Sequence, residues 1–156
     1  MKLVKQAGDG WQYQLNKAEA NCLQNLLSRF PITANAAVKI SRTDGDPRAA
    51  EREKLLNESL AGHRETLKKR ARSLAGADKF RARGNGWLLS INSGERESLF
   101  QILNDIRVGS WRALGEPEDL ETQSPNPTEQ EEAFYNIMNL AGYFEHNLLK
   151  LEEAEG

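Results

Sequence analysis

Residues 95–115 read ERESLFQILNDIRVGSWRALG, and this stretch decides the fold of the chain. Its apolar residues recur at steps of three and four, which is the spacing of one face of an α-helix. Gly115 and Pro117 then interrupt the pattern, as expected where a helix ends. The sequence therefore predicts a central helix with one face on a hydrophobic core. Its apolar positions are Leu99, Ile102, Leu103, Ile106 and Ala113.

A polar cluster borders the apolar face of this predicted helix. Residues three, four and seven apart share one side of a helix, so these polar side chains should lie together beside the core. We consider a partly buried ion pair between Asp105 and Arg112, or an arginine of another element, whose disruption would cost about 3–5 kcal/mol. We interpret the cluster as structural, with a functional surface as the alternative. It comprises Asn104, Asp105, Arg107, Trp111 and Arg112, and the last predicted helix places Asn136, Asn139, Glu145, His146 and Asn147 to join it.

Composition limits the class of protein. Of the 156 residues, 38% are hydrophobic and 28% are charged. A chain of this length can bury roughly 70% of its unfolded surface as one domain, residues 1–156. No apolar run approaches the ~18 residues of a membrane-spanning helix, and the N-terminal sequence lacks the apolar stretch of a secretory signal. The single cysteine, Cys22, cannot form an internal disulfide. We therefore expect a single-domain cytoplasmic protein with no membrane contact and no cofactor.

Turn signals predict two β-hairpins. The sequence GDG at residues 8–10 separates two alternating segments, and GNG at residues 84–86 separates two more. Because an isolated hairpin is only marginally stable, we expect the two hairpins to form a small antiparallel sheet that packs on the helices. A four-helix core makes the predicted fold α+β and mainly α. The helices are expected at about residues 17–30, 47–75, 94–115 and 129–152.

Charge is unevenly distributed along the chain. Residues 1–115 hold 20 Lys and Arg against 12 Asp and Glu, whereas residues 116–156 hold 1 against 11. Either the acidic part folds onto the basic part, or each part meets its own partner, or both are ordinary solvated surfaces. The basic segment, residues 64–83, is the alternative candidate site, for nucleic-acid binding, with Trp87 available to stack on bases. The basic patch comprises Lys68, Lys69, Arg70, Arg72, Arg81 and Arg83.

Signatures of catalysis are missing from the sequence. It contains no Gly-rich phosphate loop, no CxxC, no HExxH and no supported Ser/His/Asp arrangement. His63 lies in an apolar stripe, and we interpret it as a core or boundary residue; a hydrolase or metal site at His63 or His146 is the weaker alternative. We therefore predict no catalytic or metal-ligating residue. The expected function is that of a protein-interaction or regulatory protein, monomeric or homodimeric, with nucleic-acid binding as the alternative.

The central motif resembles a known family. Residues 103–107, LNDIR, followed by residues 109–115, GSWRALG, are similar to the LNDxR…RxLG region of a bacterial family of unknown function, best known from actinobacteria. The early hairpin, the helix after it and the aromatic-rich last helix fall in a similar order. Members of the family are often encoded near an adaptor of a Clp-type protease. The resemblance therefore implies a binding or regulatory role with a protein partner.

Overall fold

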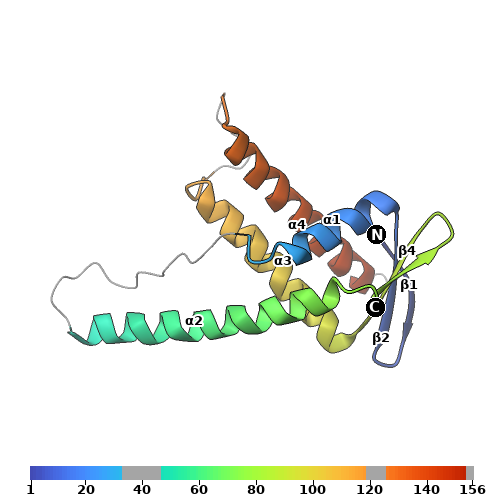
Figure 1. Cartoon of the computed structure of the whole chain (residues 1–156), viewed down its shortest axis with the longest axis horizontal. Helices are drawn as coiled ribbons and strands as arrows, with labels where there is room; N and C mark the ends of the chain where they lie inside the picture. The colour runs from blue at the N-terminus through green and yellow to red at the C-terminus, as the bar shows by residue number, and fades with distance from the viewer. Residues whose placement is uncertain (33–46, 119–125, 154–156) are drawn as a thin grey trace.

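The computed structural model describes residues 1–32, 47–118 and 126–153, and its elements alternate between hairpins and helices (Figure 1). The predicted α+β, mainly α, fold is confirmed, and each of the four predicted helices is present. The helices are α1 (Lys17–Ser28), α2 (Pro47–Leu74), α3 (Ser93–Ala113) and α4 (Glu129–Glu153). The strands are β1 (Lys2–Ala7), β2 (Gly10–Leu15), β3 (Phe80–Arg83) and β4 (Gly86–Asn92).

The two hairpins form one antiparallel sheet with the strand order β1-β2-β4-β3. The central pairing joins β2 to β4, so that Tyr13 lies opposite Leu89. This pairing confirms the small sheet expected from the two turn signals. It also explains its stability, because four strands with one buried face hold together where a single hairpin would not. The side chains of Tyr13, Leu15, Leu89 and Ile91 on this face are at most 4% exposed.

Side-chain caps determine where two of the helices begin. Asn16 caps α1 by accepting a hydrogen bond from the backbone N–H of Glu19, and the Glu19 carboxylate accepts one from the backbone N–H of Asn16 in return. Asn92 caps α3, because its side chain accepts a hydrogen bond of 2.8 Å from the backbone N–H of Glu95. These local bonds satisfy backbone donors that have no partner inside the helix.

Helix α3 lies at the centre of the core. It packs along α4 more extensively than any other two elements of the described chain pack together, and it also contacts α2. Figure 1 shows α3 and α4 side by side, with α1 crossing near them. The predicted apolar face of α3 is buried except for Ala113, which is exposed in the last turn. Its buried members Leu99, Ile102, Leu103 and Ile106 are at most 2% exposed.

Helix α2 joins the core only through its C-terminal part. Its residues from Leu67 onward contribute to the core, whereas no residue from 48 to 66 is buried. Figure 1 shows this N-terminal part of α2 extending beyond the other described helices. We call residues 48–66 the α2 arm. Three of its leucines, Leu55, Leu56 and Leu60, are exposed by 60%, 38% and 38%.

Candidate functional site

A groove of about 480 Å³ lies between α3 and α4. This volume falls in the range of roughly 300–1,000 Å³ that is typical of ligand sites. The indole Nε1–H of Trp111 donates to the carbonyl oxygen of Pro117 at 3.0 Å, which holds the ring in place at the end of α3. On α4, Met138 is 6% exposed. The lining residues are Arg107, Val108, Trp111, Met138, Asn139 and Gly142.

Gly142 lines the groove at the middle of α4. A Cβ atom added to Gly142 would meet no atom within 4 Å, so packing does not require a glycine there. Glycine in a helix interior costs about 1 kcal/mol relative to alanine. Gly62 in α2 is equally free of close contacts, but of the two only Gly142 lines the groove. Gly142 therefore indicates that the groove is the candidate functional site.

Arg107 connects the two helices beside the groove. Its Nη2 donates to Oδ1 of Asn104 at 3.2 Å, and its Nη1 lies 3.6 Å from Oε2 of Glu145 on α4. The Arg107 side chain is 48% exposed, so this ion pair contributes only about 0–1 kcal/mol. The structure thus brings Arg107 and Trp111 of the predicted cluster into the groove, with Asn104 and Glu145 beside them.

Glu145 is a largely buried acid next to the groove. It is 9% exposed, and its Oε1 accepts no hydrogen bond from any described residue. Burial raises the pKa of Glu145, and the positive charge of Arg107 offsets this only in part. The ionised carboxylate therefore destabilises the fold at neutral pH.

We expect Glu145→Gln to raise the free energy of unfolding at pH 7 by about 1 kcal/mol, because the amide brings no charge into the buried site. The pKa of Glu145 is higher in the folded chain, so ionisation of Glu145 costs stability above this pKa and none well below the ordinary value of 4.5. The advantage of Glu145→Gln should therefore disappear as the pH falls toward that value.

Urea unfolding at a series of pH values measures this difference. Glu97→Gln, on the exposed side of α3, is the matched control and should change stability little at any pH. Equal stability of wild type and Glu145→Gln at pH 7 would show that the buried carboxylate carries no cost.

Asp105 does not form the predicted ion pair with Arg112. It is half-buried, and the described chain provides no hydrogen-bond or ion-pair partner for it. Arg112 instead lies 4.0 Å from Glu116, one turn further along the chain. The prediction was wrong because residues seven apart on a helix share a face but are separated by about 10 Å along its axis. Removal of the Asp105 carboxylate therefore breaks no ion pair, and the large loss of stability expected from a buried pair does not follow.

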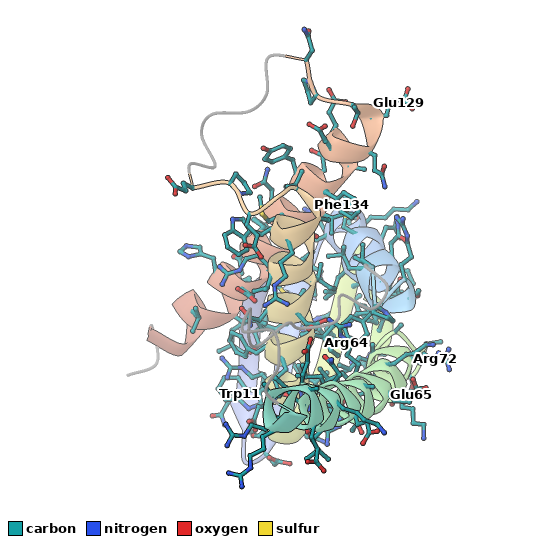
Figure 2. The ribbon with its side chains drawn as sticks, turned by 90° about the vertical axis from the view of Figure 1, so that its left-hand side faces the viewer. Trp11, Arg64, Glu65, Arg72, Glu129 and Phe134 are labelled. Atoms are coloured by element: carbon teal, nitrogen blue, oxygen red, sulfur yellow. The ribbon has the colours of Figure 1, made fainter. Side chains whose placement is uncertain are left out.

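The predicted basic patch is divided between α2 and β3. Glu65 lies on the same flank of α2 as Arg72, as Figure 2 shows and as their spacing of seven requires. Arg70 donates to Oγ of Ser98 at 3.1 Å, beside a pocket of about 410 Å³ between α2 and α3. Within the described chain, no ion pair neutralises the patch. Its residues are Lys68, Lys69, Arg70 and Arg72 on α2, and Arg81 and Arg83 on β3.

The two histidines lie on different helices and are both exposed. The interpretation of His63 as a core or boundary residue is wrong, because α2 enters the core only at Leu67. Among the described residues, no group of three or more His, Cys, Asp or Glu could hold a metal ion. Of the other α4 residues expected in the cluster, Asn139 lines the groove, Asn136 and His146 are exposed, and Asn147 donates to the carbonyl oxygen of Tyr143.

Arg96 is the polar residue that sequence reasoning missed. It is 8% exposed; its Nε donates to Oη of Tyr13 at 2.7 Å, and its Nη2 donates to the carbonyl oxygen of Leu148 at 3.1 Å. Its guanidinium carbon lies 4.2 Å from the ring centre of Trp11, a favourable cation–π geometry. Arg96 thereby joins the sheet, α3 and α4. One signal was available: Arg96 lies three residues before Leu99, on the apolar face of α3.

A further polar contact joins α1 to α4. Tyr143 donates to Oε1 of Glu19 at 2.6 Å, and the amino group of Met1 lies 2.5 Å from the same oxygen. Burial alone would raise the pKa of Glu19, but these hydrogen bonds, together with one from Asn16, hold it below its ordinary value. The hydrogen bond to the Glu19 carboxylate raises the pKa of Tyr143. This contact lies outside the residues that line the groove.

No family model, curated protein or solved structure matches this chain. The resemblance of residues 103–115 to a bacterial family therefore stays a prediction. None of the described helices has both the length and the apolar character needed to cross a membrane.

Proposed function

We propose that this protein is a non-enzymatic interaction protein that binds a protein partner in the groove between α3 and α4. Gly142 is the observation that supports this most directly, because it lines the groove at the middle of α4 and places no side chain in it. The six lining residues are apolar or hydrogen-bonding, and none of them is a side chain that ordinarily acts as a nucleophile or general base.

The groove is suited to an apolar side chain flanked by a carboxylate. Trp111 is of a type that dominates binding energies at protein interfaces, and Met138 adapts readily to different apolar partners. The half-exposed Arg107 lies at the side of the groove, where its guanidinium can donate to an acidic group. We infer that the partner inserts an apolar side chain from a helix or loop and places an Asp or Glu near Arg107.

The resemblance of residues 103–115 to a bacterial family of unknown function supports the same proposal. Arg107 and Trp111 lie within that motif and also line the groove. A regulatory protein of the bacterial cytoplasm that recognises one protein partner would use the motif as its binding surface and would need no cofactor.

Site-specific photo-crosslinking tests the proposed function. A photoreactive side chain at Asn139, on the exposed rim of the groove, should capture a partner from a lysate of the source organism. The same side chain at Glu97, on the exposed side of α3, should not. A repeatable absence of any captured protein, or equal capture at both positions, would contradict the proposal.

Two variants then test whether the groove itself is responsible. Gly142→Phe should abolish capture by filling the groove, whereas Gly62→Phe should leave it intact, although both glycines lie in helices with nothing within 4 Å of an added Cβ. With the purified partner, Trp111→Ala should weaken binding about 30-fold, as expected for an aromatic residue that dominates an interface.

A second candidate function is nucleic-acid binding through the basic patch. It is favoured by the absence, within the described chain, of any ion pair to the six residues of the patch. Glu65 lies on the same flank of α2 as Arg72, about 10 Å away along the axis, and reduces the positive charge on that flank. Electrostatic binding of this kind should weaken steeply as the salt concentration rises. A mobility-shift assay at low salt in which neither DNA nor RNA is retarded would exclude it.

A further inference from the structure

The α2 arm carries a stripe of residues in which Leu56, Leu60 and His63 are exposed and Ala49 and Glu53 are half-buried. Successive residues of this stripe are four and then three positions apart in the sequence. This is the spacing of the positions that face the partner helix in a coiled coil. The stripe leads into Leu67, which is 2% exposed and belongs to the core, whereas no residue of the arm is buried. Its members within the arm are Ala49, Glu53, Leu56, Leu60 and His63.

We propose that two copies of this chain pair through their α2 arms as an antiparallel helical pair. The arm extends from residue 48 to residue 66, so its midpoint is residue 57. With a two-fold axis near this midpoint, the α2 arms of the two copies pack against each other over their full length. Each arm then begins beside Leu67 of the second copy, where the core of that copy starts.

The charges of the stripe complement one another in this arrangement. Coiled-coil packing places Leu56 opposite Leu60 of the second copy, and the symmetry repeats this contact on the other side of the axis. One layer further out, Glu53 lies opposite His63 of the second copy. A carboxylate thus lies opposite an imidazole, whose N–H can donate to it, at both ends of the leucine layers.

The alternative parallel arrangement lacks this complementarity. In a parallel pair, each stripe residue lies opposite its own copy, so Glu53 would meet Glu53 and His63 would meet His63. The two facing Glu53 carboxylates repel each other, which disfavours that pairing. In the antiparallel pair the flanking positions also avoid like charges, because Ser59 lies beside Ser59 close to the axis and Arg52 lies beside Thr66.

The length of the stripe determines how strong this dimer is. From Ala49 to Leu67 it spans fewer than three heptads, and sustained coiled coils usually need ~3–4. The dimer is therefore reversible, and it dissociates on dilution. It does not involve the α3–α4 groove, so it extends the proposed function and can fail or hold independently of it.

Sedimentation velocity over a range of protein concentrations tests the pairing. The wild-type mass should rise from 17.5 kDa toward twice that value as the concentration increases. The double variant Leu56→Asp, Leu60→Asp should remain at 17.5 kDa throughout, with unchanged helical circular dichroism. Leu55→Asp is the matched control, because Leu55 is more exposed than either of these leucines but lies off the stripe, and it should dimerise as wild type does.

Two further measurements test the orientation. Glu53→Lys should weaken dimerisation, and adding His63→Glu should restore it, which no purely structural role of either residue predicts.

In a Cys22→Ala background, a short bismaleimide should crosslink Ser59→Cys but not Ala49→Cys. In the antiparallel pair the two copies of residue 49 are separated by about 27 Å along the helix axis. Wild-type protein that stays monomeric at all concentrations, loss of dimer in Leu55→Asp, or crosslinking at residue 49 in preference to residue 59 would overturn the proposal.

Discussion

Arg96→Met is expected to lower the free energy of unfolding by about 3 kcal/mol. Methionine retains the length and apolar contacts of the side chain but removes the guanidinium. The hydroxyl of Tyr13 and the carbonyl oxygen of Leu148 each lose a charged donor, and such hydrogen bonds contribute about 1.5–3 kcal/mol apiece. The cation–π contact with Trp11 is lost as well.

Guanidinium chloride unfolding measures this loss as a shift in midpoint with an unchanged slope. Arg112→Met is the matched control on the same helix, because the Arg112 side chain is 44% exposed and its contact with Glu116 is long. That control should change stability by less than about 1 kcal/mol. If Arg96→Met proved as stable as wild type, Arg96 would not be what joins the sheet to α3 and α4.

Gly86→Ala is expected to destabilise the protein by about 2–3 kcal/mol. An added Cβ at Gly86 would overlap the backbone carbonyl oxygen of Leu15 and would lie 2.7 Å from Nε2 of Gln14. Leu15 pairs with Trp87 in the neighbouring strand, so the carbonyl group cannot move away without disturbing the ladder between β2 and β4. This ladder joins the two hairpins into one sheet.

The same chemical change at Gly142 provides the contrast. Gly142→Ala meets no atom within 4 Å and should stabilise α4 by about 1 kcal/mol. Thermal unfolding monitored by circular dichroism should therefore shift in opposite directions for the two variants. A stabilising effect of Gly86→Ala would mean that the two strands do not approach as closely as the pairing requires.

Local sequence signals predicted most of the secondary structure. The capping pattern of Asn16 and Glu19 marks the start of α1, and the two Gly-rich turns mark the hairpins. The periodicity of residues 99–106 predicted the buried face of α3. These features depend on residues within a few positions of one another, where backbone geometry and side-chain reach leave few alternatives.

The candidate site was predictable only in part. The sequence indicated Arg107 and Trp111 as members of one cluster, and both line the groove. It did not identify Gly142, because one glycine in a helical pattern has no visible purpose until the space around it is known. It also paired Asp105 with Arg112, because sharing a helix face is a weaker condition than contact.

The sequence by itself determined the elements of this protein, and the tertiary structure decided which of them meet. Arg96 reaches Tyr13 across 83 residues and Leu148 across 52, and no local pattern specifies contacts at such separations. The apolar stripe of α2 is continuous in sequence, yet only the part from Leu67 onward finds a core, which leaves His63 exposed. Periodicity shows which face of a helix is apolar; what covers that face depends on how far the neighbouring elements extend in space.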